Sequence, residues 1–387
     1  MTALRHVAIV GGSQAGVTAA NTLRTAGFDG RITLYSAEER PPYSRPPLSK
    51  DILLGRGDAA SADFHVEEGV ELRLGVRATG LDARARRLRL STGEEAGYDG
   101  LVIATGARAR SLARTPEDAT DELRLRTMDD ALDLRERLKG SGSVAVAGGG
   151  PLGMEIASVC RDLGRDVTVV DFLPPMRRQV GGYLAELITE AARDTGVRFV
   201  QTAGPAHVAG HAVVSGGHRV AADVVVTAAG ELPNVEWLAG SGLIHADGLF
   251  VDHRLWAAPG VVAAGDVVLL PTPAGPVRTP LWTNALDQGK AAATTLLTSK
   301  SAPAYQARPY FWTEQFGLSI KVCGTIPGDA PPVVVTGDRA ERALVLQWLS
   351  GGVPVAAATV NHRMPVAGLR RLATADSTLS PSRRGNQ

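Results

Sequence analysis

The chain has 387 residues, which is enough for two or three domains with buried cores. Its 41 basic and 40 acidic side chains nearly cancel, so the charge balance indicates neither a nucleic-acid-binding nor a membrane-surface role. The sequence contains no apolar run as long as about 18 residues and no charged segment followed by an apolar leader. We therefore expect a cytoplasmic protein with no membrane and no nucleic-acid partner.

Cysteine and histidine usage excludes two kinds of centre. Cys160 and Cys323 are the only cysteines and form no C-x-x-C pair, which argues against a redox disulfide or a cysteine-bound cluster. We expect both thiols to lie in the core. Three of the eight histidines lie close together but lack the spacing of a metal site, so no metal is predicted: His207, His211 and His218.

A dinucleotide-binding turn follows the first predicted strand. The apolar segment 6–10 leads into Gly11-Gly12-Ser13-Gln14-Ala15-Gly16, and a helical pattern covers 17–24. This order puts a pyrophosphate on a helix N-terminus in Rossmann folds. We expect Gly11 to make the tight turn and Gly16 to allow close helix packing, with Ser13 tolerated where glycine usually approaches phosphate. An ordinary βα turn is the alternative, which a second copy of the motif disfavours.

The segments between the two copies alternate between strands and a helix. A strand-rich stretch covers 70–90, and 98–106 reads as a buried parallel strand that ends in a turn. A charged helical connector is predicted over 129–139.

The second glycine turn begins about 137 residues after the first and has all three glycine positions filled. The strand 143–147 leads into Gly148-Gly149-Gly150-Pro151-Leu152-Gly153. The next strand ends at Asp171, close to the spacing of an acid that hydrogen-bonds a ribose 2′-hydroxyl, which favours NADH over NADPH. Arg177 and Arg178 lie near enough in sequence to moderate this preference. A solvated strand-end acid is the alternative for Asp171.

The remaining pattern predicts one Rossmann unit inserted into another. A helix over 183–193, short strands over 197–214 and a closing strand over 223–230 complete the second unit, and beyond Gly317 short strands with Pro/Gly turns predict a small α+β domain. The fold class is therefore α/β, with two Rossmann-like domains and an α+β C-terminal domain. The predicted boundaries are 1–108 and 231–308 for the first nucleotide domain, 109–230 for the second, 309–372 for the C-terminal domain and 373–387 for a frayed polar tail.

Six segments in the same order resemble those of FAD-dependent ferredoxin reductases, the NADH-oxidising flavoproteins that supply rubredoxins or 2Fe-2S ferredoxins of oxygenase systems. The segments are Pro41-Pro42-Tyr43-Ser44-Arg45-Pro46-Pro47-Leu48-Ser49-Lys50, Ala104-Thr105-Gly106, Gly148 to Glu155, Ala263-Ala264-Gly265-Asp266, Trp282 to Gly289, and Phe311-Trp312-Thr313-Glu314-Gln315. The resemblance implies the two-dinucleotide-binding fold of glutathione reductase, with FAD on the first turn and NADH on the second.

The resemblance also implies a set of cofactor-binding residues. They are Gly11, Ser13, Gln14, Ala15, Gly16, Glu38, Arg45, Lys50, Thr105, Gly106, Gly265, Asp266, Trp282, Gly148, Gly150, Pro151, Leu152, Gly153, Glu155, Asp171, Gly230 and Trp312.

Several of these residues have a physical reason beside the resemblance. Asp266 could accept hydrogen bonds from the flavin ribityl chain or cap a helix, and Arg45 could neutralise the FAD phosphates or be a solvated loop arginine. Pro46 and Pro47 are expected to hold their segment extended. Glu38 can still serve as the acid for the FAD adenosine ribose, whereas the neighbouring Ala37 replaces a frequent acid.

Lys50 and Glu155 are the predicted catalytic residues. In the reductases that this chain resembles, the matching lysine and glutamate pair beside the flavin, where the lysine steadies developing negative charge and the glutamate meets the nicotinamide. A solvated helix-start lysine and an ordinary helix residue are the alternatives. Trp282 and Trp312 could cover a cofactor ring edge or be buried aromatics.

Departures from the family pattern leave the electron acceptor open. Pro280 replaces a glutamate, Leu281 replaces a small polar residue, and Leu232 lies in the turn 230–234, all near the expected cofactor mouth. The primary hypothesis is hydride transfer from NADH to FAD and single-electron transfer to a ferredoxin-type 2Fe-2S protein or rubredoxin. The alternatives are a flavoprotein that acts directly on a small metabolite and an NADH-sensing flavoprotein that changes oligomeric state.

Six arginines of the C-terminal third could form part of a docking face for an acidic ferredoxin. The alternative is that they are scattered, solvated arginines. These are Arg308, Arg339, Arg342, Arg363, Arg370 and Arg371. The sequence is compatible with a monomer or a homodimer.

Overall fold

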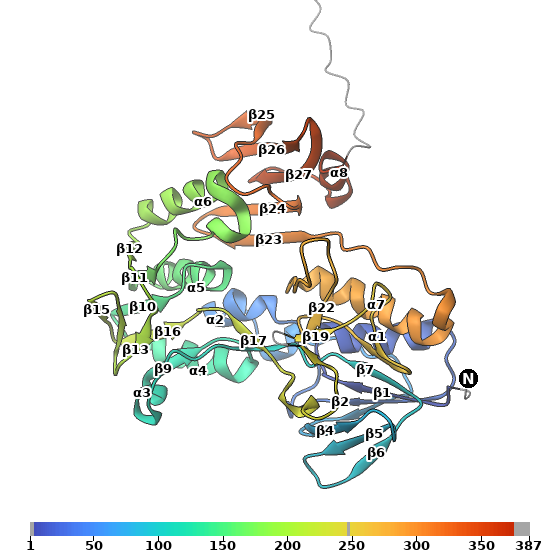
Figure 1. Ribbon diagram of the computed structural model, residues 1–387. Coiled ribbons are helices and arrows are strands. Elements are labelled where there is room, and N and C mark those ends of the chain that lie inside the picture. Colours follow the sequence, from blue (N-terminus) through green and yellow to red (C-terminus); the bar gives the residue numbers. More distant parts are fainter. Residues whose placement is uncertain (1–3, 246–247, 375–387) are drawn as a thin grey trace, which may run out of the picture. The chain divides into compact units, whose positions relative to one another are not determined.

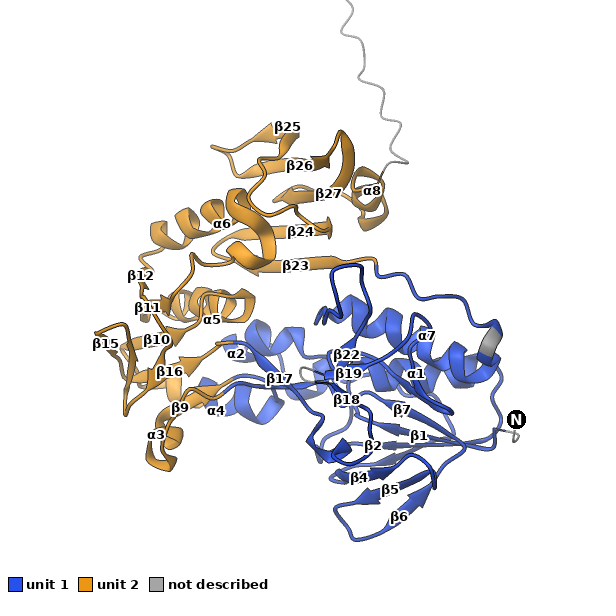
Figure 2. Cartoon of the chain, in the orientation of Figure 1, with its two compact units in different colours: residues 1–110, 125–135, 230–307 blue, residues 111–124, 136–229, 308–387 orange. Residues whose placement is uncertain are grey.

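The structure is a computed structural model that describes residues 4–245 and 248–374. It divides into two compact units, shown in two colours in Figure 2. Unit 1 comprises 1–110, 125–135 and 230–307, and unit 2 comprises 111–124, 136–229 and 308–387. Most of the tail predicted over 373–387 lies outside the described residues. Of the helices within the described ranges, none is both long and apolar enough to cross a membrane.

Unit 1 is built on a six-stranded sheet in the order β20-β21-β7-β1-β2-β3, with β20 antiparallel to β21 and the other pairs parallel (Figure 1). The strands are β1 His6–Val10, β2 Arg31–Tyr35, β3 Val70–Arg73, β7 Gly100–Ile103, β20 Trp256–Ala258 and β21 Val261–Ala263. β7 is buried along its whole length, as expected for a parallel strand covered on both faces.

Helices α1 (Gln14–Thr25) and α7 (Trp282–Thr298) pack together against this sheet (Figure 1). Their close approach depends on Gly289, where a Cβ would lie 2.6 Å from the Ala15 carbonyl oxygen. An antiparallel sheet shares the same hydrophobic core through residues such as Leu81 and Leu88. Its strands are β4 Ala78–Asp82, β5 Arg87–Leu90 and β6 Glu95–Gly97.

The remaining elements of unit 1 are short. They are α2 Asp51–Leu54, the 3-10 helices Pro46–Ser49, Ala59–Ala62, Glu236–Leu238 and Ser299–Ser301, the pair β8 Ala107–Ala109 and β17 Glu231–Pro233, and the sheet of β18 Ile244–His245, β19 Gly248–Phe250 and β22 Val268–Leu269. Helix α4 (Met128–Lys139) contains the boundary between the units at 135–136.

Unit 2 contains a second parallel sheet, in the order β12-β11-β10-β16-β9. Its strands and helices are β9 Glu122–Arg124, β10 Ser143–Ala147, β11 Asp166–Asp171, β12 Arg198–Gln201, β16 Val224–Thr227, α3 Pro116–Asp121, α5 Pro151–Asp162 and α6 Arg177–Asp194. A small antiparallel sheet packs on it, formed by β13 His207–Val208, β14 Ala212–Ser215 and β15 His218–Ala221.

The C-terminal part of unit 2 is an antiparallel five-stranded sheet in the order β23-β24-β27-β26-β25 with one helix. The elements are β23 Tyr310–Gln315, β24 Leu318–Gly324, β25 Val333–Asp338, β26 Ala343–Ser350, β27 Val353–Val360 and α8 Val366–Leu372. The predicted α/β class, with two Rossmann-like sheets and a small α+β C-terminal domain, is confirmed.

Candidate functional site

The first glycine turn connects β1 to α1 and leaves no room for side chains at two positions. Gly11 has φ +121°, and a Cβ there would lie 2.1 Å from the Ala104 carbonyl oxygen. A Cβ on Gly16 would lie 1.9 Å from the Gly11 carbonyl oxygen, so both positions require glycine. Ser13 begins α1 in an extended conformation, and its hydroxyl does not cap the helix. The N-terminus of α1 is therefore suited to receive an anionic ligand.

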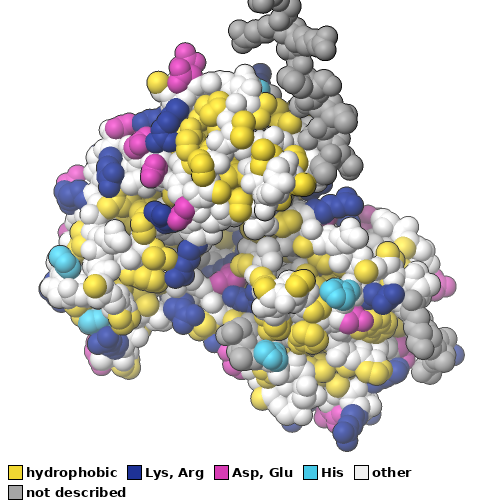
Figure 3. Space-filling model, turned by 45° about the horizontal axis from the view of Figure 1, so that its top comes forward, with side chains coloured by type: hydrophobic (Ala, Val, Ile, Leu, Met, Phe, Trp, Pro, Cys, Tyr) yellow, Lys and Arg dark blue, Asp and Glu magenta, His cyan; other side chains and the backbone are white. Residues whose placement is uncertain are grey.

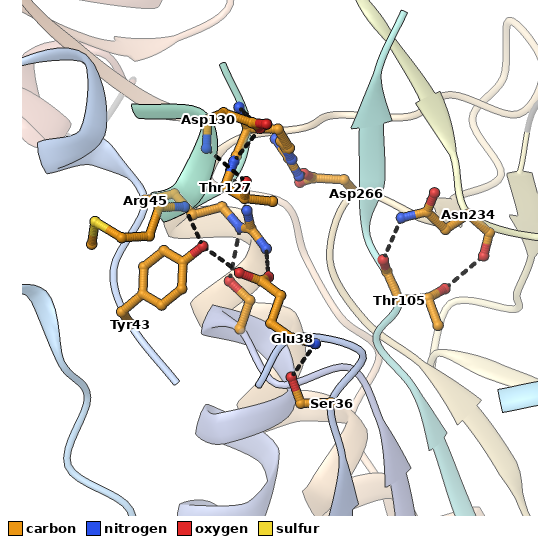
Figure 4. Close-up of polar contacts among 12 residues, drawn as sticks. Ser36, Glu38, Tyr43, Arg45, Thr105, Thr127, Asp130, Asn234 and Asp266 are labelled. Carbon is orange, nitrogen blue, oxygen red and sulfur yellow. Dashed lines mark hydrogen bonds and ion pairs between the residues drawn. The ribbon is translucent and has the colours of Figure 1, made fainter. Parts of the chain in front are cut away.

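Hydrogen bonds between Thr105 and Asn234 join the two segments by which the chain leaves and re-enters unit 1 (Figure 4). The Thr105 hydroxyl donates to the Asn234 carbonyl oxygen at 2.8 Å, and the Asn234 side-chain amide donates to the Thr105 carbonyl oxygen at 2.9 Å. Gly106 has φ +61°, which allows the chain to turn into β8. These contacts hold the crossover beside Ala104, whose carbonyl oxygen faces Gly11.

Glu38, Tyr43 and Arg45 form one hydrogen-bonded group beside the first turn (Figure 4). The Arg45 guanidinium lies 2.7 Å from Glu38 Oε1, and the Tyr43 hydroxyl donates to Glu38 Oε2. Burial raises the pKa of Tyr43, which keeps this donor protonated. Arg45 also reaches Ser13 Oγ at 3.4 Å, so the predicted phosphate-binding cation lies at the N-terminus of α1.

Asp266 follows β21 and belongs to a charged cluster that sequence reasoning missed. Its Oδ2 accepts a hydrogen bond from Arg126 Nη2 at 2.7 Å, and its carbonyl oxygen accepts one from Arg278 at 3.0 Å. The Arg126 carbonyl oxygen also accepts a hydrogen bond from the Arg45 guanidinium. The preceding Gly265 has φ +86° and donates its N–H to Gln288 Oε1 at 2.8 Å, which fixes the turn that presents Asp266.

Glu231 adds a second carboxylate to this cluster, 3.7 Å from Arg126 and 3.3 Å from Arg278. Burial and the negative charge of Asp266 raise the pKa of Glu231, and the two arginines oppose the rise. The sequence offered one signal for Glu231, namely its position in the turn 230–234, which departs from the family pattern. The two carboxylates that pair with the Arg126 guanidinium, Asp266 and Glu231, lie more than 100 residues away in sequence, and no local pattern marks Arg126.

The Pro46-Pro47 segment differs from its predicted extended conformation. It forms a 3-10 helix over Pro46–Ser49, because the φ of proline also suits the first turn of a helix. Lys50 stands between this helix and α2, and its ammonium group donates to the Pro46 carbonyl oxygen at 3.4 Å. The prediction of an extended segment was therefore wrong, and the turn presents Lys50 at the start of α2.

The second glycine turn repeats the geometry of the first. Gly148 has φ +113°, and a Cβ there would lie 2.4 Å from the Ala228 carbonyl oxygen. A Cβ on Gly153 would lie 1.9 Å from the Gly148 carbonyl oxygen. Gly150 and Pro151 begin α5, again without a side-chain cap. The same glycine-turn geometry therefore occurs once in each unit.

Asp171 ends β11 and is tied to the second turn by its side chain. Its Oδ2 accepts the Gly149 N–H at 2.6 Å, and its Oδ1 accepts the N–H groups of Phe172 and Leu173. Arg177 forms an ion pair with Asp329 at 2.7 Å, and the Arg178 guanidinium lies 5.2 Å from the centre of the Phe172 ring. Both arginines that could favour a 2′-phosphate thus have other partners in unit 2.

Glu155 lies on α5 with 8% of its surface exposed, and its Oε1 accepts a hydrogen bond from Thr313 of β23 at 2.8 Å. In the same strand Trp312 stacks with Tyr310, their ring centres 5.9 Å apart. Trp282 is the first residue of α7, in unit 1. Because Lys50 belongs to unit 1 and Glu155 to unit 2, their predicted pairing stays a prediction.

The cysteines have the character of core residues. Both are buried and free, and burial raises the pKa of Cys160 to about 12 and of Cys323 to about 11. Protonated thiols of this kind are poor nucleophiles. Across the described parts of the chain, no three His, Cys, Asp or Glu side chains gather into a group that could hold a metal ion.

Two of the six arginines expected on a docking face are engaged within unit 2. Arg339 forms an ion pair with Glu190 at 2.7 Å, and Arg342 pairs with Asp194, both acids of α6. Figure 3 shows basic and acidic side chains next to one another at its upper left. Arg308, Arg363 and Arg371 are exposed.

Comparison with known proteins gives matches over most of the chain. Residues 5–289 match the family described as pyridine nucleotide-disulphide oxidoreductase, and residues 310–387 match the family described as reductase C-terminal.

Among individual proteins, the chain is similar to the probable ferredoxin reductase CtmF of Castellaniella defragrans, at 33% identity over 98% of this chain and 96% of the relative. It is 32% identical to the ferredoxin–NAD(+) reductase component of a p-cumate 2,3-dioxygenase system from Pseudomonas putida, over 98% and 96% of the two chains. The crystal structure of the covalent putidaredoxin reductase–putidaredoxin complex matches with a TM-score of 0.85, at 28% identity over 95% of this chain and 92% of the other.

Proposed function

Because the chain belongs to the pyridine nucleotide-disulphide oxidoreductase family and carries its reductase C-terminal domain, we propose that it is an FAD-dependent NADH:ferredoxin reductase of an oxygenase system. The observation that carries this proposal is the repeated turn geometry. Gly11 and Gly148 each face a strand-end carbonyl oxygen at a distance that excludes a side chain, and each turn precedes a helix without a side-chain cap. One chain therefore has two sites suited to a dinucleotide.

The residues of unit 1 fit FAD. The N-terminus of α1 and Arg45 supply positive potential for the pyrophosphate, and Asp266, held by Arg126, supplies a hydrogen-bond acceptor for the ribityl chain. Glu38 is proposed to bind the adenosine ribose. When bound, FAD would accept a hydride from NADH and release the electrons one at a time.

The residues of unit 2 fit NADH. The turn 148–153 would receive the pyrophosphate, and Asp171, held by Gly149, would bind the adenosine ribose. A 2′-phosphate would meet this carboxylate, while Arg177 and Arg178 are engaged by Asp329 and Phe172. This arrangement favours NADH.

Lys50 and Glu155 are the proposed catalytic residues. The lysine would stabilise negative charge that develops on the flavin, and the glutamate would orient the nicotinamide. Neither forms a covalent bond with substrate in this proposal. Trp282 and Trp312 are proposed to shield the ring edges from water.

The proposed acceptor is a 2Fe-2S ferredoxin or a rubredoxin in the cytoplasm. Two relatives are named as ferredoxin reductases, and the structural neighbour is a complex with putidaredoxin. The exposed Arg308, Arg363 and Arg371 would attract an acidic partner.

The acceptor is tested by mixing the FAD-loaded protein with NADH and candidate ferredoxins at increasing salt. We expect ferredoxin reduction that slows as salt rises, because salt screens the attraction. Turnover of a small metabolite with no protein acceptor, and no reduction of any ferredoxin, would instead support the metabolite-directed alternative.

A further inference from the structure

A buried chain of polar side chains leads from the C-terminal sheet to Glu155. Gln315 Nε2 donates to Thr313 Oγ1 at 3.0 Å, and Thr313 Oγ1 donates to Glu155 Oε1 at 2.8 Å. Thr313 has no exposed surface, and Gln315 is 3% exposed. All three residues belong to unit 2, with Glu155 on α5 and the other two on β23.

The direction of these hydrogen bonds is fixed by chemistry. The amide nitrogen of Gln315 can only donate, so the Thr313 oxygen accepts from it and keeps its single proton for Glu155. A hydrogen bond to a carboxylate is stronger than one between neutral groups, and chains of such bonds polarise one another. The chain therefore holds one oxygen of Glu155 in one place.

A second contact joins the residue that follows β23 to α5, one helical turn after Glu155. The Phe316 N–H donates to Ser158 Oγ at 2.7 Å, and Ser158 is three residues after Glu155 on α5. Both residues are buried. The end of β23 is thus fixed on α5 at two points, of which only the Thr313 contact reaches the proposed catalytic carboxylate.

We propose that Thr313 is a positioning residue for hydride transfer, whose hydroxyl holds the Glu155 carboxylate in the orientation that the nicotinamide requires. This inference rests on the proposed role of Glu155. It gives the C-terminal domain a part in the reaction of NADH, in addition to any part in binding the acceptor. The second contact, through Ser158, is structural.

The test compares T313V, T313S and S158A in the FAD-loaded protein. Valine keeps the shape of threonine without the hydroxyl, serine restores the donor, and S158A breaks the second contact only. Three quantities are measured: the limiting rate of flavin reduction in stopped flow, the dissociation constant of NAD⁺ without turnover, and the thermal midpoint. A crystal structure of T313V shows whether the Glu155 side chain has moved.

We expect T313V to slow flavin reduction about tenfold while the NAD⁺ dissociation constant changes less than about twofold. T313S should recover most of the rate, and S158A should lower the thermal midpoint with a rate within about twofold of wild type. In T313V the Glu155 carboxylate should occupy a new position. Equal rates in T313V and S158A, or no recovery in T313S, would overturn the inference.

E155Q separates this inference from the function on which it rests. If E155Q slows flavin reduction but T313V does not, the role of Glu155 stands and the role of Thr313 fails. If E155Q has the wild-type rate, both roles fail. A protein that binds no FAD would contradict the proposed function itself.

Discussion

Arg126 donates a hydrogen bond to Asp266, with 2.7 Å between Nη2 and Oδ2, and the same guanidinium group lies 3.7 Å from Glu231. One cation thus lies between two partly buried carboxylates, and Arg278 supports Glu231 from a second position. This cluster holds the aspartate that we propose as a flavin ligand.

Replacing Arg126 should therefore weaken both the fold and flavin binding. R126L leaves two carboxylates without their shared cation, and we expect a loss of about 2 kcal/mol in the free energy of unfolding, reduced from the fully buried case because the side chain is partly exposed. Urea denaturation and the flavin content of the purified protein measure the two effects. R126K keeps the positive charge, so its free energy of unfolding and its flavin content should fall less than those of R126L. Full flavin content and stability in R126L would contradict the role given to this cluster.

Glu231 should make stability depend on pH. Burial and Asp266 raise its pKa above the ordinary value of 4.5. A carboxyl group with a raised folded-state pKa contributes stability below its unfolded pKa, and this contribution is lost as the pH rises through the folded pKa. The wild-type free energy of unfolding should therefore decline over that interval, and E231Q should flatten the decline.

Urea denaturation at a series of pH values from about 4.5 to 8 measures this slope. E236Q is the matched control, because Glu236 is exposed and its pKa is lowered, so its contribution has the opposite sign. A slope in E231Q equal to that of wild type would show that Glu231 does not titrate in this interval.

Single glycine substitutions should separate the role of the first turn in FAD binding from the role of the second turn in NADH binding. G11A drives a Cβ against the Ala104 carbonyl oxygen, so we expect a protein that purifies with little or no FAD. G148A makes the equivalent clash with Ala228 and should keep FAD while its NADH dissociation constant rises at least about tenfold. G140A is the control, because a Cβ there meets no atom within 4 Å. Flavin loss in G148A but not in G11A would reverse the assignment of the two sites.

Asp171 should set the preference for NADH. D171A removes the acceptor proposed for the ribose hydroxyls and the negative charge that disfavours a 2′-phosphate, so the ratio of the NADPH and NADH dissociation constants should fall about tenfold. D166N changes an exposed acid at the other end of β11 and should leave this ratio as in wild type. Titration of each variant with both nucleotides gives the result. An unchanged ratio in D171A would assign the carboxylate a purely structural role as the acceptor for Gly149.

The sequence predicts those parts of the fold that depend on short segments. The strand, glycine turn and helix at residues 6–24 and 143–162 could be recognised because their spacing is set by backbone geometry. The conformation of the Pro46-Pro47 segment could not be recognised in this way, since the φ of proline suits both an extended chain and a 3-10 helix.

The sequence does not predict the contacts that join distant segments. Arg126 meets Asp266 across 140 residues, and Thr313 meets Glu155 across 158 residues. Neither pair has a local signature, because side-chain partners of this kind are brought together only by the packed fold. The predicted roles of Lys50, Glu155 and both tryptophans stay predictions for the same reason.

The most direct test of the proposed function is anaerobic reduction of the purified protein by the two nicotinamide nucleotides, followed by the visible absorbance of the flavin. We predict a yellow protein with bound FAD that NADH bleaches at least about tenfold faster than NADPH does, and whose colour returns when an oxidised ferredoxin is added. A colourless protein that does not take up FAD, or a flavin that NADH leaves oxidised, would contradict the account.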